Sequence, residues 1–148
     1  MTISDALNGV TALGLDTAPV IYFVEAHPKY DARVTDVFQR IGEGRMSGAT
    51  SLITLTEVLT QPIAAGNGKL QEEYRDLLLN SKNFQSLQID ETIAEDAARL
   101  RARYNLRTPD ALQVATALNA GCQAFLTNDA KLARVNDIRV LVLDDLSL

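Results

Sequence analysis

Tryptophan is absent from this sequence, and cysteine and histidine occur once each, at Cys122 and His27. A single cysteine cannot form an internal disulfide, and one Cys with one His cannot supply the four ligands of a structural zinc site. Because a lone cysteine in an apolar context is usually a small core residue in a reducing compartment, we expect a cytoplasmic protein. Aromatic residues make up only 5% of the chain, so the core is expected to be aliphatic.

Long apolar runs, a leader segment and an excess of positive charge are also missing. No apolar run reaches the ~18 residues of a membrane span. No basic segment followed by an apolar one opens the chain, so we expect neither secretion nor membrane insertion. The 14 Lys and Arg residues are outnumbered by 19 Asp and Glu residues, giving a net charge of −5. This balance argues against a broad nucleic-acid-binding surface but leaves room for a local basic patch.

The remaining composition is that of an ordinary globular protein, with 47% hydrophobic and 22% charged residues. A chain of 148 residues is long enough for one domain with a substantial core and short for two. We therefore expect residues 1–148 to form a single domain. The weakly patterned residues 1–11 are interpreted as a short N-terminal extension of it.

Short apolar segments alternate with segments of helical periodicity along the whole chain. Strands are expected at 12–15, 45–49, 84–89, 123–127 and 138–143. Helices are expected at 20–25, at 31–42, from a cap at Thr50 or Ser51 to a break at Pro62, around 70–78, after a cap at Asp90, and from 108 to a stop near Gly121. This alternation predicts an α/β fold in three layers, α/β/α, with a parallel sheet between the helices. The last strand is apolar on both faces, which is typical of a central or well-covered strand.

The segment Thr108-Pro109-Asp110 has the form of a helix start, with a capping Thr, then Pro, then an acid in the first turn. A carboxylate at this position is favoured by the helix dipole alone. Any further role for Asp110 therefore depends on other acids that folding brings near it.

Three other acids are candidates to lie near Asp110 in the fold. Asp16 directly follows the first expected strand, and Asp129 lies two residues past the fourth. Because sites in parallel sheets form at the carboxyl ends of the strands, both belong at the same edge. Asp110 reaches this edge if its helix starts there, and Glu57 lies within a preceding helix.

If these four carboxylates converge with no matching Lys or Arg, they repel one another and their pKa values rise. Mg²⁺ or Mn²⁺ is then the natural occupant, and such an ion activates water against a phosphodiester. Asp16 and Asp110 are the expected direct ligands, while Glu57 and Asp129 bind directly, through water or at a second ion. The neighbouring hydroxyls of Thr17 and Thr127 are expected to orient the carboxylates near them by hydrogen bonds.

The plainer interpretation is that Asp16 and Asp129 are turn residues and that Glu57 is an exposed helical acid. A phosphatase or nucleotide-binding domain is a further alternative, although no Gly-rich phosphate loop supports nucleotide binding.

Four motifs in this order resemble those of PIN-domain proteins, and more closely those of VapC-type ribonuclease toxins of bacterial toxin–antitoxin modules. The motifs are Leu15-Asp16-Thr17, the Ser-Leu-Ile-Thr-Leu-Thr-Glu run at 51–57, Thr-Pro-Asp-Ala-Leu at 108–112 and Leu-Thr-Asn-Asp at 126–129. The resemblance spans about 13–143.

The resemblance implies a metal-dependent endoribonuclease with a five-stranded parallel sheet, acting on RNA. It also implies metal binding by four acids with a supporting hydroxyl: Asp16, Glu57, Asp110, Asp129 and Thr127. A homodimer and a cognate antitoxin lying across the site are implied as well. The alternative is a non-catalytic PIN-like module that binds RNA or protein.

The densest basic run of the chain is Arg99, Arg101, Arg103 and Arg107. One interpretation is a solvated helix face whose arginines pair with Glu95 and Asp96 on the same helix. The other is contact with RNA phosphates beside Asp110, because the guanidinium fork suits phosphate.

Overall fold

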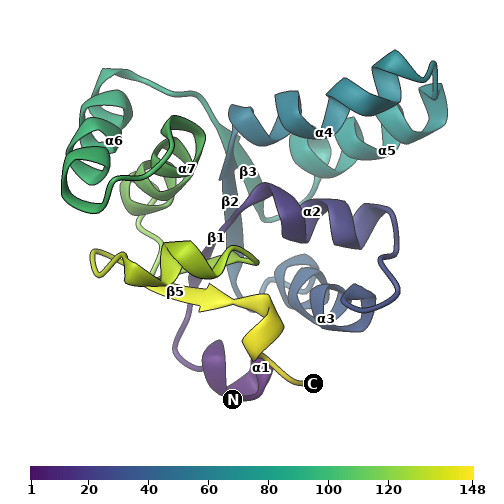
Figure 1. Ribbon diagram of the computed structural model, residues 1–148. Coiled ribbons are helices and arrows are strands. Elements are labelled where there is room, and N and C mark those ends of the chain that lie inside the picture. Colours follow the sequence, from purple (N-terminus) through teal and green to yellow (C-terminus); the bar gives the residue numbers. More distant parts are fainter.

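The computed structural model describes residues 1–148 as a five-stranded sheet between two layers of helices (Figure 1). The strand order is β3-β2-β1-β4-β5 and every pair is parallel, which confirms the predicted α/β fold. The strands are β1 (Ala12–Leu15), β2 (Ser47–Ser51), β3 (Phe84–Leu87), β4 (Ala124–Thr127) and β5 (Arg139–Val142). The chain builds outward from β1 to β3 and then returns to the other side of β1, so the order reverses between β1 and β4.

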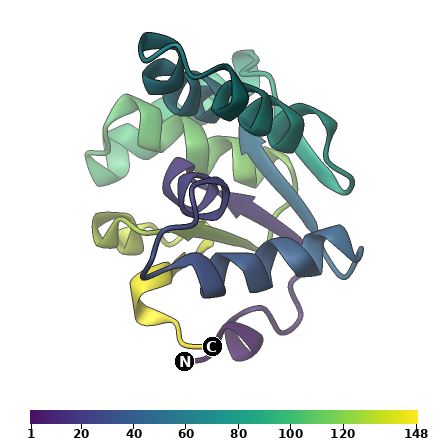
Figure 2. The same ribbon diagram turned by 90° about the vertical axis from the view of Figure 1, so that its right-hand side faces the viewer.

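Seven helices cover the two faces of the sheet. They are α1 (Ile3–Ala6), α2 (Thr17–Val24), α3 (Asp31–Gly42), α4 (Leu52–Ala64), α5 (Gly68–Asn80), α6 (Glu91–Tyr104) and α7 (Thr108–Asn119), with short 3-10 helices η1 (Ala130–Arg134) and η2 (Leu143–Asp145). The layer containing α2 to α5 faces the viewer in Figure 2, and α6 and α7 lie on the opposite side of the sheet.

The core is divided by the sheet into two clusters, because successive strand residues point to opposite faces. Leu13 and Leu15 of β1 pack into a cluster of 22 buried residues shared with α1 to α5. Phe125 of β4 packs on the other face, in a cluster of 14 buried residues with α6 and α7. Both clusters are mostly aliphatic, as expected from the scarcity of aromatic residues.

Side chains cap several helices where the sequence predicts a start. Ser51 caps α4 and Asp90 caps α6, each accepting a hydrogen bond from a backbone N–H of the first turn. Two expectations are wrong. Pro62 does not break α4. It lies inside the last turn of the helix, which continues for two more residues and ends at Ala64. Thr108 is the first residue of α7 rather than its cap, and the cap position is occupied by Arg107 without a side-chain hydrogen bond.

The strand β5 lies at an edge of the sheet and pairs only with β4, so of the two expected positions, central or well covered, the structure shows the second. Its two apolar faces are explained by helical cover on both sides of the edge. Leu141 belongs to the cluster beneath α1 to α5, and Val140 packs against the cluster beneath α6 and α7.

The residues interpreted as a short extension pack against the end of the chain. Ile3 and Ala6 of α1 are fully buried. The Ile3 N–H donates to the Ser147 carbonyl over 2.8 Å, and the Ser147 N–H donates to the Met1 carbonyl over 3.0 Å, so the two termini lie together (Figure 1).

Close packing of α7 on β1 depends on Gly14. A Cβ added to Gly14 would lie 2.5 Å from the Ala117 Cβ, which is too close for two carbon atoms that are not bonded to each other. We expect Gly14→Ala to lower the free energy of unfolding by about 1–3 kcal/mol through overpacking, measured by urea denaturation. Gly42→Ala is the matched control, because a Cβ there meets nothing within 4 Å. An equal loss in both variants would contradict this account.

Candidate active site

Two of the predicted acids meet at the point where the strand order reverses. Asp16 directly follows β1, and Asp129 follows the neighbouring strand β4. The buried Thr127 hydroxyl joins them, because it donates to Asp16 Oδ2 over 2.8 Å and accepts from the Asp129 N–H over 3.0 Å. The second Asp16 oxygen accepts from the Thr17 N–H over 2.9 Å and caps α2. Both oxygens of Asp16 are therefore fixed by the backbone and side chains around it.

Glu57 reaches the same edge from the first turns of α4. Its Oε1 accepts a hydrogen bond of 2.7 Å from the Thr17 hydroxyl, next to Asp16 in the sequence. The Glu57 side chain is exposed, whereas Asp16 is partly buried. The structure thus places one partly buried carboxylate, Asp16, and one exposed carboxylate, Glu57, next to Thr17.

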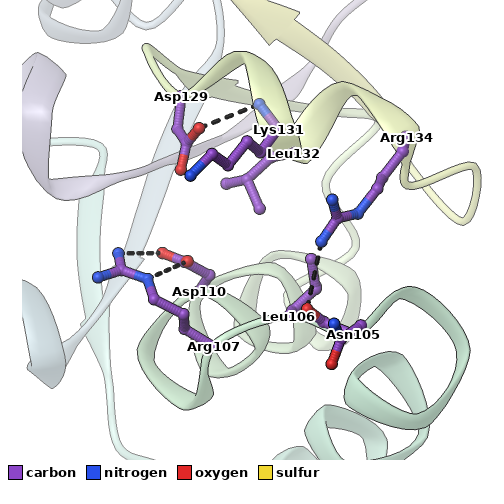
Figure 3. Close-up of a pocket in the computed structure, with 8 residues that line it drawn as sticks. All are labelled: Asn105, Leu106, Arg107, Asp110, Asp129, Lys131, Leu132 and Arg134. Carbon is purple, nitrogen blue, oxygen red and sulfur yellow. Dashed lines mark hydrogen bonds and ion pairs between the residues drawn. The ribbon is translucent and has the colours of Figure 1, made fainter.

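Asp110 lies in the first turn of α7, and its carboxylate is 13% exposed. Arg107 holds it with two hydrogen bonds, Nε to Oδ2 at 3.0 Å and Nη2 to Oδ1 at 3.3 Å (Figure 3). The condition that no Lys or Arg matches the four acids is therefore not met, because Arg107 pairs with one of them. In the sequence Arg107 is the last member of a basic run that either pairs on its own helix or contacts RNA phosphates beside Asp110. In the structure it lies at the cap position of the helix that carries Asp110 and pairs with that acid.

The charges of two other acids act on Asp16 across this edge. Burial raises the pKa of the Asp16 carboxyl, hydrogen bonds from Thr127 and Thr17 oppose this, and the negative charges of Asp110 and Glu57 raise it further. The pKa of the Arg107 guanidinium is raised, first by its hydrogen bond to Asp110 and then by nearby negative charges that include Asp129 and Glu57. Arg107 therefore lies within the field of the acid cluster and neutralises part of it.

A buried glutamine that is not among the predicted site residues connects the segments that carry the acids. Gln113, on α7 and 2% exposed, accepts from the Ser51 hydroxyl over 2.7 Å through its Oε1. Its Nε2 donates to the Thr54 hydroxyl over 2.7 Å and to the Thr17 hydroxyl over 3.2 Å. Thr17 in turn donates to Glu57. Gln113 is three residues after Asp110, so its position on the same helix face was the available signal.

The donor atoms at this edge suit a hydrated divalent ion better than a closed metal cage. No three of the His, Cys, Asp and Glu side chains form a group that could hold a metal ion by themselves. Mg²⁺ is usually bound through one or two carboxylates and keeps several waters. A partly buried Asp16 with a raised pKa, facing the charges of Asp110 and Glu57, is a site that gains from added positive charge.

The rest of the basic run is occupied elsewhere. Arg99 pairs with Asp96 at 2.8 Å on the same helix, and Arg103 pairs with Asp137 at 3.0 Å. Both arginine side chains are more than 60% exposed, at 68% and 63%. These residues form a solvated surface, and Arg107 alone of the run lies at the acids.

None of the helices has the length and apolarity that crossing a membrane requires.

Comparisons with known proteins agree with this architecture. No curated protein matches the chain. VapBC2 from Rickettsia felis, in a structure bound to a DNA fragment from its promoter, is 16% identical with a TM-score of 0.70, covering 88% of this chain and 97% of that one. A toxin–antitoxin complex from Klebsiella pneumoniae is 24% identical with a TM-score of 0.67, covering 89% and 97%. DNA-bound VapBC from Salmonella typhimurium is 18% identical with a TM-score of 0.60, covering 89% and 97%.

Identities this low show a shared fold. The sequence profile of the PIN domain matches residues 14–138, which include all four acids, the strands β2, β3 and β4, and the last two residues of β1. This match extends over most of the chain. The chain belongs to the PIN domain family.

Proposed function

We propose that this protein is a Mg²⁺- or Mn²⁺-dependent endoribonuclease and the cytoplasmic toxin of a VapBC-type pair. The observation that carries the proposal is the partly buried Asp16 carboxylate, held at the reversal of strand order with its pKa raised by burial and by the charges of Asp110 and Glu57. Membership of the PIN domain family and the likeness to proteins from toxin–antitoxin complexes support it.

In this proposal each site residue has a distinct task. Asp16 and Asp110 hold the ion, and Glu57 and Asp129 complete its surroundings directly or through water. The ion, when bound, supplies Lewis-acid activation of water and neutralises charge on the phosphate. Thr127 fixes one oxygen of Asp16, so the carboxylate is oriented before the ion arrives.

A cognate antitoxin and a homodimer belong to the same proposal. The antitoxin is supported by the likeness to VapBC2 and to the Klebsiella pneumoniae toxin–antitoxin complex, whose chains this one matches over nearly their whole length. The homodimer is proposed from the resemblance of the motifs to VapC-type toxins. Copurification of this protein with the product of a neighbouring reading frame would test the first, and sedimentation of the purified chain would test the second.

A non-catalytic binding module is the second candidate, and two observations favour it. Arg107 already satisfies the Asp110 carboxylate, and no three acids are grouped to hold an ion. In such a module the arginine would permanently replace the metal.

Metal binding and RNA cleavage separate the two candidates. For the nuclease we expect Mg²⁺ to raise the melting temperature, since a ligand at 100 times its Kd stabilises the folded state by about 2.7 kcal/mol. We also expect cleavage of an end-labelled single-stranded RNA that stops when EDTA is added. Absence of both the thermal shift and the cleavage, with Mn²⁺ as well as Mg²⁺, would leave the binding module as the better description.

A further inference from the structure

A cavity of about 600 Å³ begins at two of the acids and continues along η1 (Figure 3). Its lining residues are Asn105, Leu106, Arg107, Asp110, Asp129, Lys131, Leu132 and Arg134. The volume falls in the range of roughly 300–1,000 Å³ that is typical of sites for small ligands. Asp110 and Asp129 lie at one end of the cavity together with Arg107, which is paired with Asp110, and the cations Lys131 and Arg134 line it from η1 (Figure 3).

Two of these cations have no anionic partner in the protein. Lys131 and Arg134 take part in none of the ion pairs of the structure. Arg134 donates one hydrogen bond, from Nη2 to the Asn105 carbonyl over 3.2 Å. A guanidinium has five N–H donors and an ammonium has three, so most of their donors stay available. The two side chains therefore bring unpaired positive charge to the lining of the cavity.

The local structure places these cations where an anion would meet them. Lys131 and Arg134 are three residues apart on η1, and side chains with this spacing lie on the same face of a 3-10 helix. Leu106 and Leu132, which are 4% and 1% exposed, form an apolar floor between them. The 12-residue helix α7 begins at the cavity without a side-chain cap, so the positive end of its dipole adds to the field.

The lining also indicates which part of a polynucleotide would be held. No aromatic side chain lines the cavity, so the stacking platform on which single-stranded bases usually rest is missing. Lysine and arginine donors instead match phosphate oxygens, which carry no sequence information. The cavity therefore suits the backbone of a strand rather than its bases.

We propose that Lys131 and Arg134 form a backbone-phosphate site for single-stranded RNA, directly beside the acids Asp110 and Asp129. This inference rests on the proposed nuclease function and deepens it. The strand runs along η1, its phosphates are held by the two free cations, and the next phosphate is placed at the acids. The site contributes affinity and register and leaves the choice of sequence to other surfaces.

The test compares two double variants that remove the same charge. Lys131→Gln with Arg134→Gln removes the proposed site, and Arg99→Gln with Arg103→Gln removes two exposed cations of α6 that lie outside the cavity. Binding of a fluorescent 12-nucleotide single-stranded RNA is followed by anisotropy in EDTA, over a series of salt concentrations. Melting curves show that both variants are folded.

Each phosphate contact to a single strand contributes about 0.7 to the slope of log affinity against log salt. We therefore expect the cavity variant to lose about 1.4 from this slope, while the α6 variant retains the wild-type slope. Equal slopes in the two variants overturn the phosphate site while leaving the nuclease proposal intact, provided that the wild type binds and cleaves RNA. A wild type that neither binds nor cleaves RNA overturns both.

Discussion

Asp16→Asn is expected to reduce RNA cleavage by about 100-fold or more and, at the same time, to raise the melting temperature of the metal-free protein. Substitutions of groups that merely orient a metal ligand typically reduce activity 10–100-fold, so loss of a direct ligand belongs at or above the upper end. The gain in stability is expected because the substitution removes a negative charge that is desolvated and repelled by Asp110 and Glu57. For a chain of this size, each kcal/mol of repulsion removed raises Tm by roughly 2–4 °C.

The effect on stability has a definite pH dependence. The pKa of Asp16 is raised in the folded state by burial and then by neighbouring acids, so the folded protein binds this proton more tightly than the unfolded chain does. In metal-free buffer the wild type therefore gains stability as the pH falls through the folded-state pKa of Asp16. The gain is complete below the unfolded value of about 3.9. The Asn variant lacks this contribution, so its advantage over the wild type shrinks as the pH falls.

Asp90→Asn is the matched control for this prediction. Asp90 also caps a helix, accepting from the Ile93 N–H over 2.9 Å, and it lies away from the acid cluster. Asn is as good a helix cap as Asp, so neither variant loses its capping hydrogen bond. We expect Asp90→Asn to leave cleavage and Tm unchanged. A lower metal-free Tm for Asp16→Asn would contradict the view that the acids at this edge repel one another.

The fold and two of the acids could be predicted because their signals are local. Alternation of apolar strands with helical periodicity fixes an α/β arrangement, and the carboxyl end of a parallel strand locates Asp16 and Asp129 without any knowledge of the neighbours. The position of β5 could not be found in this way. A strand that helices cover on both faces is apolar throughout, whether it lies at the centre or at the edge of the sheet.

The partners of the acids were harder to predict because they depend on side-chain direction at helix ends. Arg107 belongs by sequence to a run whose other members lie on the surface of α6. Only the turn between α6 and α7, in which Asn105 adopts a left-handed conformation with φ of 55°, separates it from them and directs it to Asp110. Charge patterning along the sequence does not contain that turn.

Gln113 could not be recognised in the sequence for a different reason. The second prediction with a large expected effect concerns this residue. In sequence it is one polar residue within an apolar helix, yet it is 2% exposed and every buried polar side-chain atom around it is paired. Its amide joins α7 to Ser51 and Thr54 of the α4 region and to Thr17, which holds Glu57. Gln113 thus acts as a positioning residue that relates three of the four acid-bearing segments.

Gln113→Met keeps the length of the side chain and removes its hydrogen-bonding groups. Because the buried Ser51 hydroxyl loses its acceptor, we expect the free energy of unfolding to fall by about 1–3 kcal/mol. Because Thr17 and Glu57 lose their support, we also expect kcat to fall 10–100-fold and Mn²⁺ affinity to weaken, with KM for RNA little changed. Urea denaturation, EPR titration with Mn²⁺ and steady-state cleavage measure the three quantities.

Gln39→Met controls for the chemistry of the exchange, since Gln39 is exposed on α3 and donates only to Glu43 of the same helix end. It should change none of the three. Metal affinity and kcat are to be measured at a temperature where the Gln113 variant is fully folded, which separates positioning from stability. If Gln113→Met is destabilised but binds Mn²⁺ and turns over like the wild type, the buried network serves the fold alone, and the acids are oriented by their own strand ends and by Thr127.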